Sequence, residues 1–198
     1  MPFFLQPGVV RNIDEWNIRM TTTIPYPFEL VTERLVIRSP AVAVAPHMCE
    51  AIKESIETLR PWLPWATHVP SLKEEEETCA KAAQDFKDNK DFRLHLFLKS
   101  FGVFIGGSGL HEVDWSIPKF EIGYWVRPSY SGHGYITEAI AEITRFALEE
   151  LGAKRVEIQI STRNIKSWRI PERLGFTLEG ILRNNGRHVD GSLKDTKV

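Results

Sequence analysis

This sequence has few cysteines and no long apolar runs. Its two cysteines, Cys49 and Cys79, are too few among 198 residues for a disulfide framework, so we expect a protein of a reducing compartment. No apolar run approaches the roughly 20 residues that cross a bilayer. The first residues also lack the basic and long apolar regions of a secretory signal. We therefore expect a cytoplasmic protein with no membrane partner.

An excess of charge of either sign is also lacking, with 25 Lys and Arg against 26 Asp and Glu. A domain that binds nucleic acid through its overall charge normally has a basic surface, so we expect no direct nucleic-acid partner. The histidines show no metal-ligand spacing with one another or with the cysteines, so we expect no metal site. Each is interpreted as a surface or packing residue: His47, His68, His95, His111, His133 and His188.

The composition is that of a single folded domain. Hydrophobic residues make up 42% and charged residues 26% of the chain, which allows a buried core and excludes a disordered tail. We expect one domain over residues 28–198, preceded by an N-terminal extension over residues 1–27. That extension is interpreted either as a flexible segment or as residues upstream of a true start at Met20.

Hydrophobic periodicity predicts a mixed α/β chain. The short connections in the middle of the chain imply antiparallel neighbours. Strands are expected at residues 32–38, 92–98, 103–105, 120–126, 155–161 and 177–183, and helices at residues 45–60, 71–91, 137–151 and 165–174. Ser71 followed by Glu74 forms a capping box that begins the second helix. Asn185-Gly186 predicts a hairpin turn, after which we expect an incomplete returning strand.

The segment over residues 124–138 carries the clearest chemical signal, because a strand enters a glycine-containing turn and a helix begins directly after it. Gly132 and Gly134 allow unusual backbone angles and a close approach to a ligand. The free amides and positive dipole end of the helix suit a phosphate group. A dinucleotide-binding turn would need a third glycine at Thr137, and a P-loop would need Lys at Tyr135. A plain tight turn remains the alternative to an anion site.

Two further groups of residues have competing interpretations. Residues 106–109 are similar to a nucleophile elbow, but Leu110 stands where that motif requires glycine, so we expect a bulge or a close-packed strand end. Trp62 and Trp65 are interpreted either as walls of an acceptor cleft or as core residues. Trp115 and Trp125 are further candidates for the walls of that cleft, although for Trp125 packing in the core is favoured.

Five segments follow one another in a recognisable order. They are TERLVIR at residues 32–38, LRPWLPW at 59–65, EIGYW at 121–125, GHGYITEA at 132–139, and NIKS with PERLGF between 164 and 176. This series resembles the GNAT superfamily of N-acetyltransferases, and within it the ribosomal-protein serine/alanine N-acetyltransferases (RimJ/RimL-like). The resemblance covers the chain from Phe28 to the C-terminus. It implies a mixed, mostly antiparallel sheet with a splayed central parallel strand pair flanked by helices.

The resemblance also implies a coenzyme site for acetyl-CoA. The strand over residues 121–127 would splay from its parallel neighbour at 155–161 and admit the pantetheine arm. The implied contacts are the backbone of Trp125, Val126 and Arg127, the amides of Ser131, Gly132, His133, Gly134, Tyr135, Ile136 and Thr137 around the pyrophosphate, and Asn164. Ser167 matches the hydroxyl residue proposed in the family as general acid. Arg163, Lys166 and Arg169 are interpreted as ligands of the 3′-phosphate or as solvated residues.

The sequence departs from the family at the general base. The family's proposed catalytic Glu lies in the segment that matches residues 184–186, where this chain has no acid. Glu121 is the candidate in its place, because it begins the splayed strand, and Glu157 on the neighbouring strand is the second. A surface-strand role is the alternative for both.

The implied reaction is transfer of an acetyl group from acetyl-CoA to a primary amine, by direct attack in a ternary complex without an acyl-enzyme. The expected acceptor is the N-terminal α-amine of a protein of the ribosomal type. An α-amine, with a pKa of about 7.7–8.0, demands less of a base than a lysine does. Two alternatives stay open, namely a small-molecule amine such as an antibiotic or a polyamine, and a non-catalytic acyl-CoA-binding module. We expect a monomer or a homodimer.

Overall fold

A computed structural model describes residues 24–198, so residues 1–23, the greater part of the predicted extension, lie outside the described residues. Ile24 is only 4% exposed and packs in the main core. The Tyr26 hydroxyl donates to the carbonyl of Pro40 at 2.8 Å. The core therefore begins before residue 28, the position at which the sequence predicts its start.

Within the described residues, six strands form the main sheet in the order β1-β2-β3-β4-β5-β6. All neighbours are antiparallel except β5 and β6, which are parallel. The strands are β1 (Glu29–Val31), β2 (Leu35–Arg38), β3 (Phe92–Leu98), β4 (Phe104–Asp114), β5 (Lys119–Val126) and β6 (Arg155–Glu157). The prediction of a mixed, mostly antiparallel sheet is confirmed.

A second, smaller sheet follows with the strand order β7-β9-β8. Its strands are β7 (Ile160–Ser161), β8 (Ile181–Arg187) and β9 (Leu193–Lys197). The prediction of one strand over residues 155–161 is wrong, because β6 pairs with β5 whereas β7 pairs with β9 in the other sheet. The apolar pattern runs on through Ile158, which is buried in the break, so periodicity does not reveal the division.

The hairpin of the second sheet does not turn at Asn185-Gly186, so that prediction is wrong. Both residues lie within β8. The strand bulges there, with Asn184 at a φ of 51° and its amide donating to the carboxylate of Asp195 at 2.8 Å. The chain reverses instead over residues 188–192, where Gly191 has a φ of 82°. β9 then returns and pairs with both β7 and β8.

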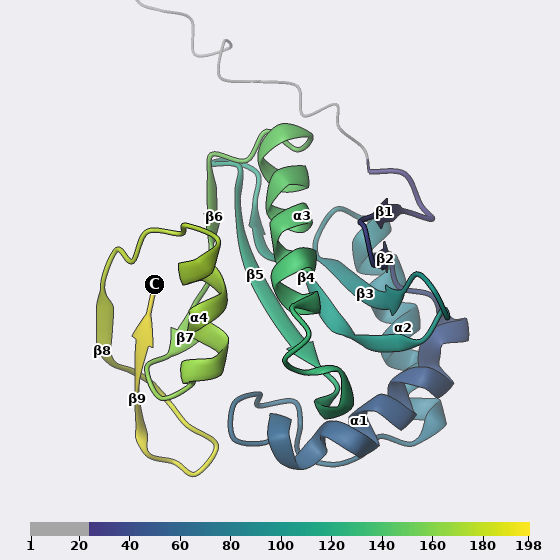
Figure 1. Ribbon diagram of the computed structural model, residues 1–198, viewed down its shortest axis with the longest axis horizontal. Helices are drawn as coiled ribbons and strands as arrows, with labels where there is room; N and C mark the ends of the chain where they lie inside the picture. The colour runs from purple at the N-terminus through teal and green to yellow at the C-terminus, as the bar shows by residue number, and fades with distance from the viewer. Residues whose placement is uncertain (1–23) are drawn as a thin grey trace, which may run out of the picture.

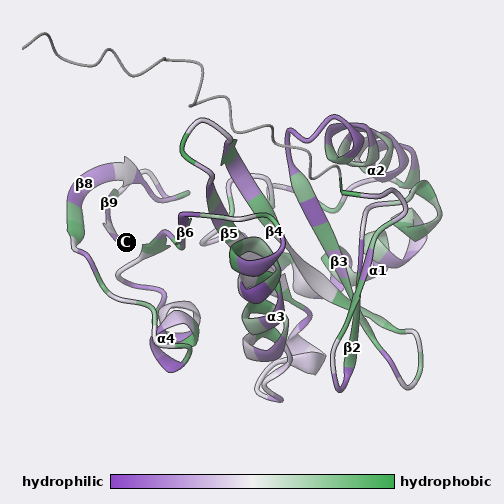
Figure 2. Cartoon of the chain, turned by 90° about the horizontal axis from the view of Figure 1, so that it is seen from above, coloured by the Kyte–Doolittle hydropathy of each residue, from purple (hydrophilic) through white to green (hydrophobic). Residues whose placement is uncertain are grey.

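Helices cover both faces of the main sheet. In the described part of the chain they are α1 (Ala45–Leu59), α2 (Leu72–Lys87), α3 (Tyr135–Glu149) and α4 (Ile165–Arg173), with 3-10 turns η2 (Val42–Val44) and η3 (Pro128–Tyr130). Figures 1 and 2 show α1 and α2 on one face and α3 on the other, with α4 and the second sheet beside β6. The α-helices agree with the predicted helices to within a few residues at each end.

Apolar stripes on the helices build a core on each face of the sheet. On α1, Met48, Ile52 and Ile56 face the sheet and form one cluster. On α3, Ile140 and Ile143 are fully buried in the other. These are the residues whose helical spacing predicts α1 and α3, because burial of such a stripe is what stabilises a short helix.

α2 begins with a capping box and ends four residues before Asp91, a residue that lies near the site. Its first turn contains the predicted capping box, in which the Ser71 hydroxyl accepts from the amide of Glu74 at 3.3 Å and the Glu74 carboxylate accepts from the amide of Ser71 at 2.7 Å. The helix ends at Lys87 rather than at residue 91, because Asn89 adopts a φ of 56° that a helix does not allow. Asp91 then lies directly before the first residue of β3.

Candidate active site

β5 and β6 separate after a short parallel contact. Residues 119–121 pair with residues 155–157, and beyond Glu121 the described part of β5 pairs only with β4. The chain after β6 turns away to join the second sheet, as Figure 1 shows. A wedge therefore opens along the free edge of β5, and this is the splayed strand pair that the resemblance implies.

The backbone of β5 presents alternate residues to this wedge. The amide of Arg127 donates to the carbonyl of Ile105 at 2.8 Å, so it is directed toward β4. Because neighbouring residues in a strand direct their backbone groups to opposite sides, those of Val126 and Tyr124 face the wedge. Among the three predicted pantetheine contacts, Val126 is thus placed to bond an extended ligand, whereas the amide of Arg127 is already bonded within the sheet.

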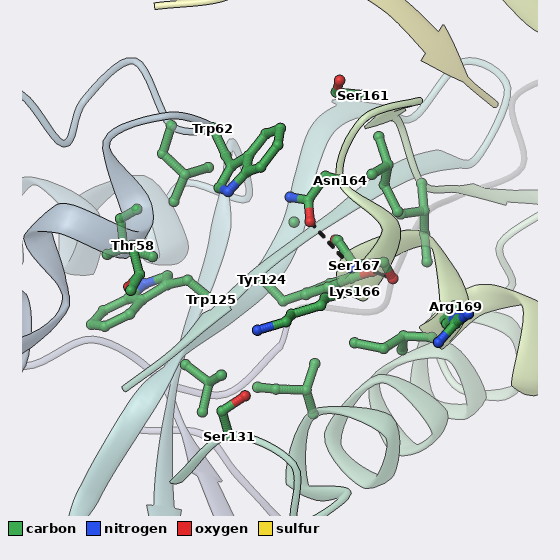
Figure 3. Close-up of a pocket in the computed structure, with 18 of the residues that line it drawn as sticks. Thr58, Trp62, Tyr124, Trp125, Ser131, Ser161, Asn164, Lys166, Ser167 and Arg169 are labelled. Atoms are coloured by element: carbon green, nitrogen blue, oxygen red, sulfur yellow. Dashed lines mark hydrogen bonds between the residues drawn. The ribbon is translucent and has the colours of Figure 1, made fainter. Parts of the chain in front are cut away.

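A cavity of about 1070 Å³ fills the wedge and extends from the end of α1 to α4 and the hairpin of the second sheet. Figure 3 shows Asn164, Lys166 and Ser167 on one side of it and Thr58, Trp62 and Trp125 on the other. The predicted site residues that line it are Glu121, Trp125, Val126, Ser131, Gly132, Gly134, Tyr135, Ile136, Thr137, Asn164 and Ser167. Arg127 and His133 do not line it.

Residues 131–137, hereafter the glycine loop, place a row of amides at the N-terminus of α3. Gly132 and Gly134 have φ values of 82° and 81°, which a residue with a Cβ adopts only with strain. Within the described residues, the amides of 132–137 donate no hydrogen bond, and the helix dipole adds positive potential. The amide of Ser131, which is also a predicted contact, instead donates to the carbonyl of Pro128 at 3.1 Å. Ile136, 7% exposed, packs in the core, so its side chain leaves the loop open. The arrangement suits an anion such as a diphosphate.

Arg34 and Glu138 hold the glycine loop against the start of β2. The carboxylate of Glu138 accepts from the Thr32 hydroxyl at 2.6 Å, the Arg34 amide at 2.8 Å and the Arg34 guanidinium at 2.6 Å. That guanidinium also donates to the carbonyl of His133 at 3.0 Å. Although burial opposes it, the bonds from Thr32 and Arg34 hold the pKa of Glu138 below its usual range. The Arg34 guanidinium therefore bonds both to the first turn of α3 and to a carbonyl of the loop. Sequence reasoning missed this role of Arg34.

Arg127 contributes to the site through its side chain rather than its backbone. Its guanidinium donates to Glu54 at 2.7 Å and to Glu50 at 2.9 Å, both on α1. Glu54 also accepts from the amide and hydroxyl of Ser129, at 3.0 and 2.7 Å. Although burial opposes it, these bonds hold the pKa of Glu54 below its usual range. We call this group (Glu50, Glu54, Arg127 and Ser129) the α1 clasp, because it fastens α1 to the chain that leads into the glycine loop.

Ser167 is held in place by hydrogen bonds to both its backbone amide and its backbone carbonyl. Its amide donates to the side chain of Asn164, the N-cap of α4, at 3.3 Å, and its carbonyl accepts from the Tyr124 hydroxyl at 2.9 Å. Burial raises the pKa of Tyr124 to about 12, so the phenol remains a donor. The Ser167 hydroxyl makes no hydrogen bond to another described residue. The predicted acid is therefore on the cavity wall with its proton available.

The two predicted carboxylates lie opposite each other but differ in surroundings. Glu121 lines the cavity, and burial, followed by the nearby charges of Glu157 and Glu112, raises its pKa. Glu157 is bonded to Arg155 at 2.6 Å and lies 3.6 Å from Lys119. Although burial opposes it, these partners hold the pKa of Glu157 below its usual range. Only Glu121 has both cavity access and an increased affinity for a proton.

Basic and aromatic side chains complete the cavity. Lys166 and Arg169 line it from α4, whereas Arg163 donates to the Ser192 hydroxyl at 3.2 Å. Trp62 and His188 approach edge-on with ring centroids 6.4 Å apart, and both line the cavity. Trp62 is therefore a residue of the cavity wall, as one of its two interpretations predicts. His188, interpreted as a surface or packing residue, also forms part of that wall. No local signal marks His188, because the hairpin that carries it meets the α1–α2 connection only in the folded chain.

Within residues 24–198, no three His, Cys, Asp or Glu side chains gather as a group that could hold a metal ion. No helix in the same range is both long and apolar enough to span a membrane.

Residues 34–177, which include the wedge, the glycine loop and α4, match the family model described as an acetyltransferase (GNAT) domain. The chain belongs to the GNAT acetyltransferase family. The resemblance found from the five sequence segments is therefore confirmed, and with it the assignment of the protein as an N-acetyltransferase.

GNAT relatives include proteins named for ribosomal substrates. "Putative ribosomal N-acetyltransferase YdaF" of Bacillus subtilis (strain 168) is 33% identical over 81% of this chain and 89% of its own. "Ribosomal-protein-serine acetyltransferase" of Escherichia coli (strain K12) is 26% identical over 71% and 80%. A structure of RimL, a ribosomal L7/L12 α-N-protein acetyltransferase in complex with coenzyme A, superimposes with a TM-score of 0.79 over 88% and 94%, at 19% identity. That last likeness is one of fold.

Proposed function

We propose that this GNAT enzyme transfers the acetyl group of acetyl-CoA to the N-terminal α-amine of a protein, of the ribosomal-protein type. The observation that carries the proposal is the row of unpartnered amides at the end of the wedge between β5 and β6. The names of the YdaF and Escherichia coli relatives support the acceptor class. Transfer would be direct, with both substrates bound at once.

The coenzyme would bind along the wedge. The amides of residues 132–137 would hold the pyrophosphate, and the backbone of β5 around Val126 would hold the pantetheine arm as an added strand. Lys166 and Arg169 lie on the same cavity wall, where they would attract the 3′-phosphate. Asn164 would serve mainly by beginning α4 and so positioning Ser167, because its side-chain oxygen already caps the helix.

The chemistry requires a neutral amine, a polarised thioester and a proton for the departing thiolate. Ser167 is the proposed donor of that proton, since its hydroxyl is free on the cavity wall. Glu121 is the candidate base that the sequence supplies, and its raised pKa makes its carboxylate a better proton acceptor than an exposed Glu. His111, the cross-strand partner of Glu121 on the same face of the sheet, is a second candidate base.

Release of coenzyme A thiol over a panel of amines tests the proposal. The panel contains peptides with free Ser or Ala N-termini, the same peptides with blocked N-termini as matched controls, a blocked peptide containing lysine, a polyamine and an aminoglycoside. We expect thiol release with the free α-amine peptides and none with their blocked counterparts. Release with the small amines alone would replace the proposal by the small-molecule alternative. Calorimetric binding of acetyl-CoA without release by any amine would leave a binding module.

A further inference from the structure

A second cavity, of about 530 Å³, lies between the main sheet and the helices α1 and α2. It shares part of its wall with the first cavity, so the two adjoin across β5. The shared residues are Leu63, Gly123, Tyr124 and Trp125. A group in the second cavity can therefore approach β5 at the residues that the first cavity also reaches.

Three glycines on β4 and β5 allow aromatic rings in the second cavity to pack directly on the backbone of the sheet. A Cβ on Gly109 would lie 2.8 Å from Nε2 of His111, and one on Gly107 would lie 2.8 Å from Nε1 of Trp125. A Cβ on Gly123 would lie 3.6 Å from the same Nε2. The imidazole of His111 thus rests directly on the backbone of β4 and β5, next to Tyr124. Such an approach is possible only where side chains are missing.

His111 is oriented by a carboxylate from outside its own strand. Its Nδ1 lies 2.7 Å from Oδ2 of Asp91, which stands between α2 and β3. Although burial opposes it, the bond to His111 and the charge of Arg93 hold the pKa of Asp91 below its usual range. An ionised carboxylate only accepts, so Nδ1 carries a proton, and in the neutral form of the ring Nε2 carries the lone pair. Within the described residues Nε2 has no hydrogen-bond partner, and the ring lines the cavity.

Other polar groups in this cavity also lack partners. Both ring nitrogens of His95 are buried without a hydrogen bond, although the residue is only 1% exposed. Burial, with the charge of Arg93, lowers the pKa of His95 to about 4, so it is neutral at physiological pH. The guanidinium of Arg93 makes no ion pair with a described residue. Buried polar groups are normally paired, so such a set indicates a cavity that takes a polar ligand.

We propose that the second cavity receives the acceptor amine and that His111, held by Asp91, accepts its proton. This inference rests on the proposed acetyl transfer and names the acceptor side of that same site. His111 is the catalytic residue and Asp91 is a positioning residue.

The proton balance of the step is simple. The amine nitrogen forms a bond to the thioester carbonyl carbon, and the carbon–sulfur bond breaks. The proton lost by the amine passes to Nε2 of His111, and the departing thiolate takes a proton from Ser167, which regains one from solvent, or directly from water. His111 then returns its proton to solvent. The coenzyme and Ser167 act from the α4 side of β5 while His111 acts from the α1 and α2 side, so acid and base do not compete for one position.

Glu121 is the rival base, and it lies directly across from His111 in the β4–β5 register. The two differ in exposure to the cavities, since Glu121 lines the first and His111 the second. A pH profile must therefore separate them from each other and from the remaining ionisable groups near His111. Those groups are Asp91, Arg93 and His95 beside it, Glu112 next in the chain, and His68, Glu74 and Glu75 on the far wall.

The test compares His111→Gln, Asp91→Asn and Glu121→Gln with the control His47→Gln, whose parent residue is exposed on α1 and lines neither cavity. The readout is kcat against pH at saturating acetyl-CoA and acceptor, with any amine that the wild type acetylates. Calorimetry with acetyl-CoA checks that each variant is folded. We expect His111→Gln to lose about 100-fold or more in kcat and to lose the acid limb of its profile, with coenzyme affinity unchanged. Asp91→Asn should lose less, and His111→Ala should recover in part with added imidazole.

Retention of wild-type kcat by His111→Gln, or loss of the acid limb in Glu121→Gln alone, would overturn the proposal. Failure of the proposed acceptor class would show differently, because a wild type that acetylates only small amines still permits the same comparison. A loss of coenzyme affinity in His111→Gln as large as its loss of kcat would also count against the proposal, since His111 lies outside the first cavity.

Discussion

Ser167 shows how one residue can be held firmly while its reactive atom stays free. Its amide and carbonyl are both engaged, by Asn164 and Tyr124, and its hydroxyl makes no hydrogen bond to another described residue. The proposed role therefore needs no further contact from the side chain. Positioning through the backbone also means that removal of the hydroxyl leaves the local structure in place.

For Ser167→Ala we expect a lower kcat with little change in acetyl-CoA affinity. A thiol with a pKa of about 8.5 is already a fair leaving group, so the loss should stay below about 100-fold. Thiol release gives kcat, and calorimetry gives the dissociation constant. Ser100→Ala, in the exposed β3–β4 turn, is the matched control. Parallel loss of turnover and coenzyme affinity in Ser167→Ala would refute the role as acid.

His95 makes a separate prediction about stability. The unfolded chain binds a proton at the ordinary histidine pKa of about 6.5, whereas burial lowers the folded pKa to about 4. Between these values the unfolded state holds more protons, so stability falls as the pH falls, by up to about 3 kcal/mol from this residue. We expect His95→Leu to lose less stability than the wild type between pH 7 and pH 4.5 in urea unfolding. Carboxylates shared by both proteins cancel in the difference, and an equal loss would contradict the prediction.

At the scale of one element, the glycine loop contains residues that have both a positive φ and a proposed role in binding phosphate. Gly134 has a φ of 81° at the N-cap of α3. Gly152 has a φ of 69° just beyond the C-terminal end of α3. At both positions a residue with a Cβ would be strained by the positive φ. Only Gly134, however, belongs to the row of free amides.

This pair gives a matched test of the phosphate site. Gly134→Val and Gly152→Val should each lose stability by about 1–2 kcal/mol or more, because a β-branched residue is strained at positive φ. Only Gly134→Val should also lose acetyl-CoA affinity, by at least about tenfold, since the displaced loop no longer presents its amides. Thermal unfolding measures the first effect and calorimetry the second. Equal coenzyme affinity in the two variants would remove the glycine loop from the site.

Sequence predicts elements well where the signal is contiguous. The glycine loop could be found because strand, glycines and helix start follow one another. The break between β6 and β7 could not, because both pieces continue one apolar pattern and the separation is decided by which sheet each joins. The Asn185-Gly186 turn was wrong for a similar reason. A bond from the amide of Asn184 to Asp195, 11 residues away, accompanies a bulge at that point.

At the scale of the whole molecule, the α1 clasp joins α1 to the chain that leads into the glycine loop. Glu54 receives bonds from Arg127 and Ser129, which lie 73 and 75 residues further along the chain. The pKa of Glu54 is lower in the folded protein than in the unfolded chain. Its contribution to stability is therefore present above the unfolded carboxyl pKa and is lost as the pH falls through the folded value.

Glu54→Gln tests this link. We expect a lower melting temperature than the wild type at pH 7, with the gap narrowing as the pH is lowered past the ordinary carboxyl pKa of about 4.3. Melting curves at several pH values measure the gap. Glu57→Gln, from an exposed position on the same helix, is the control and should show little change at any pH. A gap for Glu54→Gln that stays constant with pH would show that its ionisation is not what fastens α1.

Long-range pairs explain why the site was only partly predictable. His111 and Asp91 are separated by 20 residues, and Arg34 and Glu138 by 104. Neither pair forms a motif, and histidine spacing alone assigned His111 to the surface or the core. The proposed coenzyme side is built mainly from one continuous stretch, whereas the proposed acceptor side is assembled from five elements (α1, α2, β3, β4 and β5) and the connection between α1 and α2. Physical proximity on that side is a property of the fold alone.

The two cavities adjoin at β5 and extend from it in different directions, the first to α4 and the second to α2. This arrangement has a kinetic consequence. If coenzyme and acceptor enter by separate routes, neither has to leave before the other can be exchanged. Spent coenzyme A could depart and a fresh molecule could load while a large protein partner remains docked over α1 and α2. A bulky acceptor would then slow its own dissociation without slowing the supply of acetyl groups.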